Sequence, residues 1–345
     1  MRCGQVTRRR PGIPGCISCG RQEGYVENMK CFVTGGAGFV GSNLVDRLLD
    51  DGHDVVCYDN FSTGQKRFLE IAESHAAFRL VQGTILDPDA LLSASKGCDI
   101  VFHLAANADV RFGPDHPGRD LEQNTVGTFN VLEAVRKNGI GRIAFSSTGS
   151  VYGVSAVIPT PEDAPFPVQT SLYGASKLAG EGLISAYAEA FGIRAWIFRF
   201  VSILGERYSH GHVFDFCQRL FKDPAHLRIL GDGTQKKSYL YVKDCVEAIM
   251  VALEKCREKV NILNLGTDEY VQVNDSVRII TGELGVSPAL SYSGGSQGWI
   301  GDNPFILLKC ERIRALGWRP RETIADSVRK TVRYIQKNGW LLEAR

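Results

Sequence analysis

The sequence predicts an α/β protein with a doubly wound parallel sheet and a smaller, mixed lid towards its C-terminus. Two observations carry this prediction. From Lys30 to Phe200, short apolar runs rich in β-branched residues alternate with amphipathic stretches, as in a parallel sheet covered by helices on both faces. After Phe200 the alternation weakens and glycine-rich loops such as Gly294-Gly295 appear. Ligands of doubly wound sheets bind outside the carboxyl ends of the strands, so we expect the site there.

The elements of the first part follow from these patterns in order. Apolar runs predict strands at Lys30–Thr34, Asp54–Asp59, Phe78–Gln82, Asp99–Leu104, Arg142–Ser147 and Arg194–Phe200. Helical periodicity predicts helices at Gly41–Asp51 and near residues 88–95, 117–138 and 171–191. Strands and helices therefore alternate through residues 29–203, which we expect to form the sheet domain.

The second part contains fewer strand patterns. We expect a strand at Asn261–Leu265 and helices near residues 242–256, 273–285, 309–316 and 322–338. Residues 240–265 are expected to return to the sheet domain. Residues 204–239 and 266–345 are then expected to form the substrate-binding lid.

Residues 1–28 differ from the rest of the chain. They are rich in Arg, Gly and Pro and show no hydrophobic period, so we expect a disordered extension. Cys16 and Cys19 have the spacing of a zinc knuckle, but only Cys3 lies nearby as a further ligand. Because tetrahedral zinc takes four ligands, no metal site is predicted there. None is predicted at His210 and His212, which also lack further ligands.

Composition and charge exclude several classes of protein. The net charge of +2 lacks the basic excess of proteins that bind nucleic acid or membrane surfaces. No apolar stretch is long enough to span a bilayer, and the N-terminus shows no secretion signal. The ten cysteines are scattered, several within apolar runs, which favours reduced thiols in a cytoplasmic protein. We therefore expect small-molecule partners.

A glycine motif follows the first predicted strand. Gly35, Gly38 and Gly41 are spaced G-x-x-G-x-x-G, which suits a tight turn and close approach of a pyrophosphate to the backbone. The N-terminus of the helix that this segment opens then offers unpaired N–H groups to the phosphates, and Phe39 and Val40 are also expected at the cofactor. Three spaced glycines could merely mark turns. The strand–turn–helix context favours a dinucleotide site on a Rossmann sheet.

An acid ends the second predicted strand. Asp59 follows Gly41 at about the spacing expected of the carboxylate that binds the ribose of a dinucleotide. It would accept hydrogen bonds from ribose hydroxyls and repel a 2′-phosphate, so NAD is favoured over NADP. The alternative is that Asp59 and Asn60 only form a turn.

Tyr173 and Lys177 stand where the sequence becomes helical. Residues four apart share a helix face, so the phenol and the ammonium can project into one crevice. A phenol is a poor base at neutral pH, but a neighbouring ammonium and the positive nicotinamide of NAD stabilise its phenolate. The pair therefore predicts proton transfer from a hydroxyl while a hydride leaves the same carbon.

From Met29 to its C-terminus the chain resembles the extended short-chain dehydrogenase/reductases, the NAD-dependent sugar epimerase/dehydratase family. Within it, the chain is most similar to nucleotide-sugar epimerases of the UDP-glucose 4-epimerase type. The matching segments are TGGAGFVG at 34–41, YDN at 58–60, HLAA at 103–106, NTVGT at 124–128, SSTGSVYG at 146–153, YGASK at 173–177 and GTQKKSYLYVKD at 233–244.

The resemblance implies residue roles. Tyr173 would be the base, Lys177 its partner and a ligand of the nicotinamide ribose, and Thr148 a hydrogen-bond partner of the reacting sugar oxygen. Asn124 would support the active-site helix. Further residues expected at the cofactor are Asn60, Thr84, Ile85, Leu104, Ala105, Ala106 and Ser146. Thr148 could instead be an ordinary loop hydroxyl, and Leu104–Ala106 could be strand-end packing. His103 is expected to be a packed strand-end residue.

The expected substrate ligands are Thr148, Ser202, Arg111, His212, Val213 and Lys237. Several positions depart from the family pattern. Ser202 stands where many relatives have Asn, Lys237 where an Arg commonly binds phosphate, and Thr84 where an Asp usually contacts adenine. Trp299, beside Gln297, stands where an Arg is expected. Whether Arg111, Arg207, Lys236 or Lys237 holds the diphosphate stays open, as does a plain surface role for Arg111.

The segment after Thr148 favours one reaction. Dehydratases of the family resemble T-D-E-V-Y-G there and decarboxylases carry a Glu, whereas this chain has Gly149 and Ser150. The resemblance therefore implies 4-epimerisation of a UDP-hexose or UDP-hexuronate through transient oxidation at C4. The alternatives are a reductase that consumes free cofactor and a non-enzymatic NAD sensor. The resemblance also implies a homodimer through the helices near 117–138 and 171–191.

Overall fold

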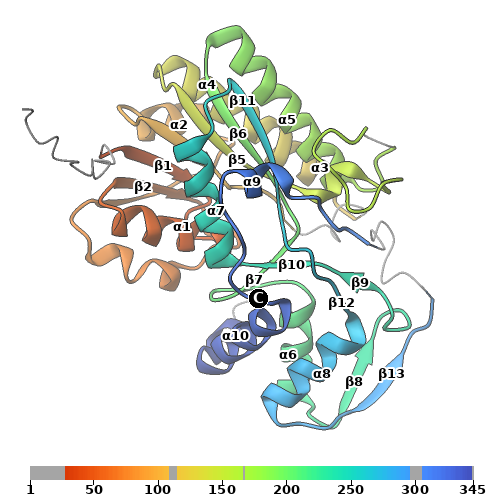
Figure 1. The fold of residues 1–345 in the computed structure, drawn as a ribbon. Coiled ribbons are helices and arrows are strands. Elements are labelled where there is room, and N and C mark those ends of the chain that lie inside the picture. Colours follow the sequence, from red (N-terminus) through yellow and green to blue (C-terminus); the bar gives the residue numbers. More distant parts are fainter. Residues whose placement is uncertain (1–27, 109–114, 166–167, 296–304, 344–345) are drawn as a thin grey trace, which may run out of the picture.

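A seven-stranded parallel sheet forms the centre of the protein, in a computed structural model that describes residues 28–108, 115–165, 168–295 and 305–343 (Figure 1). The strand order is β11-β6-β5-β4-β1-β2-β3. The strands are β1 (Lys30–Thr34), β2 (Asp54–Asp59), β3 (Phe78–Gln82), β4 (Ile100–His103), β5 (Arg142–Thr148), β6 (Arg194–Phe200) and β11 (Val260–Leu265). Thr34 at the end of β1 lies beside Tyr58 of β2 and His103 of β4, so the three strands end at one edge.

Helices cover both faces of this sheet. One face carries α2 (Pro88–Ala94), α4 (Gly127–Lys137) and α5 (Leu172–Phe191), and the other carries α1 (Phe39–Asp50) and α7 (Val242–Lys255). Their apolar residues bury two cores against the sheet, one with Val131, Val135 and Ile184 and one with Leu44 and Ile249. Burial of apolar side chains on both faces explains why the strands are continuously apolar.

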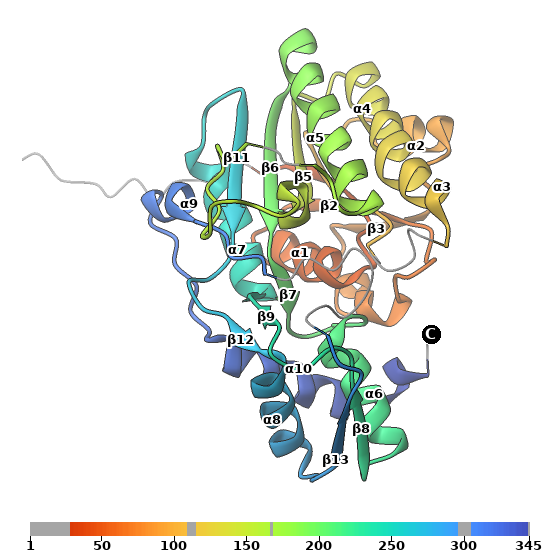
Figure 2. The ribbon, with the colours of Figure 1, turned by 90° about the vertical axis from the view of Figure 1, so that its right-hand side faces the viewer.

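The lid lies below the carboxyl edge of the sheet (Figure 2). Its helices are α6 (His212–Lys222), α8 (Val273–Leu284) and α10 (Ile324–Lys337), and its strands pair as β7 (Ser202–Leu204) with β10 (Tyr239–Tyr241), β9 (Lys236–Lys237) with β12 (Val271–Gln272), and β8 (His226–Ile229) with β13 (Ala289–Tyr292). The short α9 (Glu311–Ala315) contacts β11 instead. Phe39 of α1 is buried in the core of the lid, so the two parts share packing.

The predicted fold class is confirmed, and most predicted elements lie within one or two residues of the observed ones. The helix predicted near 117–138 is interrupted: α3 (Pro117–Asp120) leads into a π-helical turn, Leu121–Val126, and then into α4. π-Helical turns inside α-helices occur frequently at functional sites. The helix α6 and the lid strands β7, β8, β9, β12 and β13 were not predicted. These strands have only two to four residues and form by pairing with distant segments, which the local sequence does not show. The domain boundaries stay a prediction.

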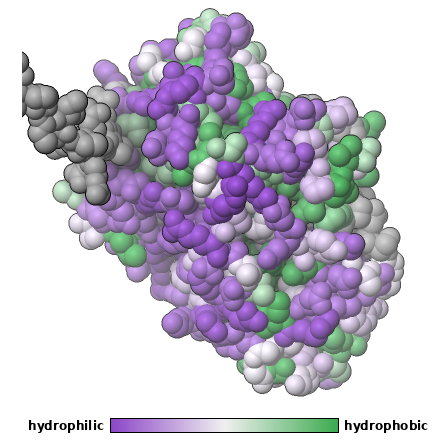
Figure 3. Space-filling model, in the orientation of Figure 1, coloured by the Kyte–Doolittle hydropathy of each residue, from purple (hydrophilic) through white to green (hydrophobic). Residues whose placement is uncertain are grey.

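The surface and the cysteines match ordinary globular packing. Hydrophilic residues predominate on the face drawn in Figure 3, where hydrophobic residues form small separate patches. The cysteines within the described ranges are free thiols, and all but the partly exposed Cys256 are buried. No helix in the described part of the chain has the length and apolar character needed to cross a membrane.

Candidate active site

A tight turn joins β1 to α1. Gly35 has a φ of +71°, and its N–H donates to the Tyr58 carbonyl oxygen at 2.8 Å. A Cβ on Gly35 would meet the Ala105 nitrogen at 2.6 Å, and one on Gly41 would meet the Gly35 carbonyl oxygen at 2.1 Å. Gly38 caps α1 without a side-chain hydrogen bond, and the first turn carries no acid. The turn therefore fits a dinucleotide pyrophosphate, which needs bare backbone and an uncapped helix N-terminus.

Asp59 lies at the end of β2 beside this turn. It is 7% exposed, and its two oxygens accept the N–H groups of Ala37 at 2.9 Å and Phe61 at 2.8 Å. Burial raises the pKa of Asp59, and these hydrogen bonds oppose that shift. The Asp59 carboxylate therefore stabilises a turn after β2, as the alternative interpretation of Asp59 and Asn60 proposes. It also binds the glycine loop through the Ala37 N–H. The exposed Asn60 accepts the Ser62 N–H at 2.9 Å, so it takes part in the same turn.

The segment after β4 runs beside the glycine turn. The Leu104 N–H donates to the Thr34 carbonyl oxygen at 3.1 Å, and the Ala105 N–H donates to the Thr34 hydroxyl at 3.3 Å. Leu104, Ala105 and Ala106 are half-buried. His103 is fully buried between the hydroxyls of Thr34 and Thr128, and burial lowers its pKa to about 3. His103 is therefore a packed strand-end residue, as predicted.

The loop after β3 contains Thr84, which stands where an Asp usually contacts adenine, and Ile85, which is also expected at the cofactor. The Thr84 carbonyl oxygen accepts the Tyr58 hydroxyl at 2.9 Å, and the Thr84 hydroxyl accepts the Leu86 N–H at 3.3 Å. Ile85 is buried, and its carbonyl oxygen accepts the Asn130 amide at 3.0 Å. Both positions therefore hold the loop in place mainly through their backbone.

Tyr173 and Thr148 meet at the carboxyl end of β5. The Thr148 hydroxyl favours the phenolate form of Tyr173 and so acts to lower its pKa. Tyr173 belongs to the first turn of α5, where the Ser171 hydroxyl accepts the Gly174 N–H at 3.0 Å. Thr148 is the last residue of β5 and accepts the Ser150 N–H at 3.1 Å. Burial raises the pKa of Tyr173 to about 12, although the Thr148 hydroxyl opposes this shift.

Lys177 reaches the same strand end from the next turn of α5. Its ammonium donates to the Ser146 carbonyl oxygen at 2.8 Å and lies 4.6 Å from the centroid of the Phe145 ring. The side chain is 2% exposed, and burial lowers the pKa of Lys177 to about 7, while Glu181 and Asp120 oppose that shift. The phenol and the ammonium thus both point to β5, as their helical spacing predicts.

A buried amide cluster packs behind this pair. The Asn124 amide donates to the Ser176 hydroxyl at 3.0 Å and accepts the Asn107 N–H at 2.8 Å. Asp120 accepts the Asn107 side-chain amide at 2.8 Å. The sequence analysis singled out Asn124 but neither Asn107 nor Asp120. The spacing of Asp120 and Asn124, one helical turn apart, is the signal that could have found the acid.

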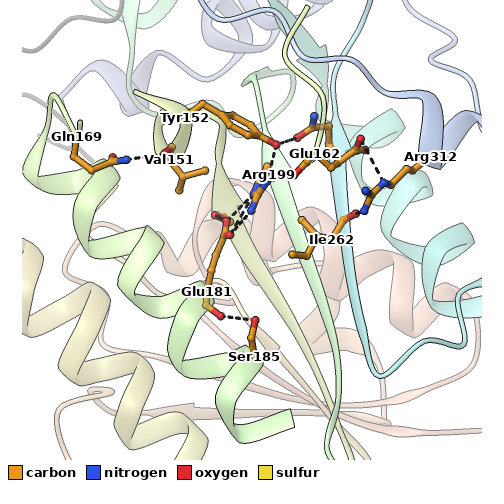
Figure 4. Close-up of polar contacts among 11 residues, drawn as sticks. Val151, Tyr152, Glu162, Gln169, Glu181, Ser185, Arg199, Ile262 and Arg312 are labelled. Carbon is orange, nitrogen blue, oxygen red and sulfur yellow. Dashed lines mark hydrogen bonds and ion pairs between the residues drawn. The ribbon is translucent and has the colours of Figure 1, made fainter. Parts of the chain in front are cut away.

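A second buried network supports the strand end from the other side (Figure 4). The Arg199 guanidinium of β6 pairs with Glu181 of α5 at 2.7 Å and donates to the Tyr152 hydroxyl at 2.6 Å. The Ser147 hydroxyl also donates to Glu181. The sequence analysis missed Glu181, although it follows Lys177 by one helical turn. The network connects α5 to the residues on both sides of Thr148.

Four of the expected substrate ligands lie in the lid, namely Ser202, His212, Val213 and Lys237. His212, the first residue of α6, contacts the Tyr239 hydroxyl and the Ser276 hydroxyl, the latter at 3.0 Å, and burial lowers its pKa to about 3. Lys237 interacts electrostatically with His212. The Val213 side chain is fully buried in the lid core, so only its backbone can face a ligand. Ser202 is exposed at the start of β7.

The other cationic side chains considered as ligands of the diphosphate differ in their surroundings. Arg207 pairs with Asp46 at 2.7 Å and is mostly buried. The Lys236 ammonium lies 4.8 Å from the centroid of the Tyr270 ring. Arg111, Gln297, Trp299 and the expected extension with Cys3, Cys16 and Cys19 lie outside the described residues. The described ranges contain no group of three or more His, Cys, Asp or Glu side chains that could hold a metal ion.

Comparison with known proteins agrees with this geometry. The chain is 34% identical over 319 residues to UDP-glucose 4-epimerase of Mycolicibacterium smegmatis, covering 90% of this chain and 100% of that protein. A crystal structure of UDP-galactose 4-epimerase is similar with a TM-score of 0.81 and 38% identity, covering 90% of this chain and 100% of the other. UDP-glucose 4-epimerase of Thermus thermophilus, solved in complex with NAD, is similar with a TM-score of 0.79 and 30% identity, covering 89% and 99%.

The family model described as the NAD dependent epimerase/dehydratase family matches residues 31–266. This range contains the glycine turn, Asp59, Thr148, Tyr173 and Lys177. The chain therefore belongs to the NAD-dependent epimerase/dehydratase family.

Proposed function

We propose that the protein is an NAD-dependent 4-epimerase of a nucleotide-diphosphate sugar, a UDP-hexose or UDP-hexuronate. The observation that carries this proposal is the position of Tyr173 and Lys177 one helical turn apart on α5, with the Lys177 ammonium at the end of β5 that also carries Thr148. A phenol, a hydroxyl and a cation at one strand end are suited to move a proton on a sugar hydroxyl. The relatives named as UDP-sugar 4-epimerases support the choice of reaction and substrate class.

In this proposal Tyr173 takes the proton of the C4 hydroxyl and later returns it. Thr148 hydrogen-bonds the same sugar oxygen, and Lys177 stabilises the phenolate by its charge. NAD held at the glycine turn would supply the reversible hydride chemistry at C4, and its oxidised ring would add a positive charge near the phenol. Because the site is buried, each of these charge effects is larger than it would be in water.

The cofactor proposal assigns the pyrophosphate to the turn of Gly35, Gly38 and Gly41 and the start of α1 with Phe39 and Val40. Asp59 would accept the ribose hydroxyls in addition to its two backbone donors, which favours NAD over NADP. Further ligands would come from Asn60, Thr84, Ile85, Leu104, Ala105, Ala106, Asn124 and Ser146. The bare backbone of the turn supports this assignment.

Packing after Thr148 supports epimerisation over elimination of water or carbon dioxide. A lyase of this family would carry a carboxylate in this segment, and Gly149 follows Thr148 directly. A Cβ on Gly149 would meet Ile306 Cγ2 at 2.8 Å and the Phe200 carbonyl oxygen at 3.3 Å. An acid at position 149 would therefore have to displace its neighbours, so the site is not built for one there.

We assign the nucleotide-diphosphate end to the lid. Lys236 and Lys237 of β9, together with the uncapped start of α6 at His212 and Val213, offer the positive charge and N–H groups that a diphosphate needs. Arg207 is less suited, because Asp46 already neutralises it. Ser202 and Arg111 remain assigned as further substrate ligands.

The purified enzyme tests the proposal when it is incubated with UDP-glucose, UDP-N-acetylglucosamine and UDP-glucuronate in turn. Mass spectrometry after chromatography that separates C4 epimers should detect inversion of one of them. If none of the three is inverted, the proposal is wrong. Stoichiometric change of absorbance at 340 nm with free cofactor would instead support the reductase, and NAD binding without turnover would support a sensor.

We further propose that the protein is a homodimer. Apolar side chains remain exposed along the π-helical turn, α4 and the start of α5, namely Leu121, Val126, Phe129 and Leu172. Exposed apolar patches of this kind commonly mark protein interfaces. Sedimentation should give twice the chain mass, and Phe129→Glu should give monomers, whereas Leu290→Glu at the far end of the lid should not. A wild-type monomer at micromolar concentration would overturn this assignment.

A further inference from the structure

Asp120 is a buried acid beside the candidate active site. It ends α3 and is 1% exposed. Its Oδ1 accepts the side-chain amides of Asn107 at 2.8 Å and Asn124 at 3.3 Å. Its Oδ2 is also buried and has no hydrogen-bond partner among the described residues. A buried carboxyl oxygen without a partner is costly, so its presence needs an explanation.

The position of Asp120 couples it to α5. Asn124, which donates to Asp120, also donates to the hydroxyl of Ser176, the residue before Lys177. Asp120 interacts electrostatically with both Lys177 and Tyr173. Two hydrogen bonds therefore connect the carboxylate to the helix that carries the phenol and the ammonium.

The charges around Lys177 come from several elements. Glu181 and Tyr173 lie on its own helix, Asp120 ends α3, and His103 ends β4. The strand β5 contributes the Ser146 carbonyl oxygen and the Phe145 ring. His103 is neutral at physiological pH, since burial lowers its pKa to about 3. Arg119 and Glu122, the neighbours of Asp120 along the chain, are exposed.

The two acids near Lys177 differ in how far they are neutralised. Glu181 is paired with the Arg199 guanidinium through three hydrogen bonds, so most of its charge is balanced. The partners of Asp120 are neutral amides. Glu181 acts more strongly on Lys177 than Asp120 does, but the neutral partners of Asp120 leave its negative charge the less balanced of the two.

We propose that Asp120 is a positioning residue for the Tyr173–Lys177 pair, whose carboxylate keeps the Lys177 ammonium charged and holds the Asn107–Asn124 cluster against α5. Asp120 touches neither substrate nor cofactor in this role and acts through Lys177. The inference rests on the proposed function, because only proton transfer at Tyr173 makes a charged Lys177 useful.

The variant Asp120→Asn tests this role, because the amide oxygen can still accept both hydrogen bonds while the charge is lost. Without the carboxylate, the pKa of Lys177 should fall by at least ~0.5 unit, since an opposite charge nearby favours the ammonium. Carbon-13 NMR of lysine-labelled, cofactor-free protein measures this titration, with the Lys177 signal assigned through Lys177→Met. The exposed Asp89→Asn is the matched control and should leave the titration unchanged.

The pH profile of turnover gives a second readout. Asp120 disfavours the phenolate and favours the ammonium, so Asp120→Asn should move both limbs of the profile to lower pH. Asp120→Glu, which keeps the charge, should leave both limbs in place even where turnover falls. A lower rate at an unchanged profile in Asp120→Asn, with an unchanged Lys177 titration, would reduce Asp120 to a structural residue and overturn the proposal.

Wild-type protein provides a test that needs no variant. Asp120 must be ionised near pH 7 for the role proposed, and carbon-13 labelling of aspartate carboxyls reports this directly. A protonated Asp120 at pH 7 would contradict the proposal even if Asp120→Asn failed to fold. Because the NMR measurements use no substrate, they separate failure of this inference from failure of the proposed reaction.

Discussion

Arg199 of β6 and Glu181 of α5, one helical turn after Lys177, form a buried ion pair (Figure 4). Arg199 Nε lies 3.0 Å from one carboxylate oxygen and Nη2 lies 2.7 Å from the other, so the pair has the bidentate geometry that arginine favours. The two side chains are 1% and 4% exposed. The pair fixes the sheet end that carries Thr148 relative to the helix that carries Tyr173 and Lys177.

Glu181→Ala should destabilise the protein by about 3–5 kcal/mol, because it leaves the Arg199 charge buried without its partner. Urea unfolding measures this loss. The control is Glu189→Ala on the same helix, whose exposed pair with Lys259 should contribute about 0–1 kcal/mol. Equal losses in the two variants would show that the buried pair does not hold the strand and helix together.

Tyr173→Phe should lower turnover by ~10²–10⁴-fold, the usual contribution of a general base, while NAD affinity and the melting temperature stay near those of the wild type. Steady-state kinetics, calorimetric titration of NAD and thermal unfolding measure these quantities. Tyr187→Phe is the matched control, because Tyr187 lies on the same helix and donates to Glu133 at 2.8 Å. Near-normal turnover in Tyr173→Phe would remove Tyr173 from the mechanism.

Lys177 should make the cofactor-free protein more stable as the pH rises above 7. The pKa of Lys177 is lowered to about 7 in the folded protein, and an unfolded lysine titrates near 10.4. The unfolded state therefore binds more protons between these values, and stability rises with pH by up to about 1.4 kcal/mol per unit. Below pH 7 the lysine is protonated in both states and its contribution no longer changes.

Urea unfolding at pH 7.0 and 8.5 tests this sign. The gain in stability seen for the wild type should be smaller by up to about 2 kcal/mol in Lys177→Met, because the substituted side chain does not titrate. The exposed Lys96→Met should keep the wild-type gain. An identical gain in wild type and Lys177→Met would mean that Lys177 titrates normally in the folded protein.

Gly41→Ala should weaken NAD binding by ~10–100-fold, since forcing a methyl group into a packed site typically costs about 1–3 kcal/mol. The added Cβ would meet the Gly35 carbonyl oxygen at 2.1 Å, and that backbone atom must move to make room. Calorimetric titration with NAD measures the affinity. Gly182→Ala on α5 is the control, because its Cβ meets nothing within 4 Å and alanine stabilises a helix by about 0.5–1 kcal/mol. Unchanged NAD affinity in Gly41→Ala would contradict the assigned cofactor site.

The sheet could be predicted because its strands carry their burial in the local sequence. The centres of runs such as Lys30–Thr34 and Arg194–Phe200 are consecutive apolar residues, Cys31–Val33 and Ala195–Phe198, as expected of a strand covered on both faces. The lid strands could not be predicted. Lys236–Lys237 pairs with Val271–Gln272, and neither dipeptide has a local preference strong enough to define a strand. The interruption by the π-helical turn Leu121–Val126 was also missed, since the hydrophobic period continues through it.

The residues of the candidate site were likewise only partly predictable from the sequence. Helical spacing predicted that Tyr173 and Lys177 share one face, and the resemblance to the family implied that Thr148 and Asn124 lie with them. Asp120, Asn107 and Arg199 were missed because their contacts join segments far apart in the chain. The assignment of Val213 to the substrate stays a prediction: its side chain lies in the lid core, so the position can bind a ligand only through its backbone.

The sequence by itself determined the order of strands and helices, the glycine turn and the residue types at the carboxyl edge of the sheet, because periodicity and motif spacing are local properties. Only the tertiary structure decided which charges are balanced. Glu181 meets a guanidinium, Asp120 meets neutral amides, and Lys177 loses its water. Burial and the pairing of distant side chains set these electrostatic properties, and neither is encoded in any short stretch of the chain.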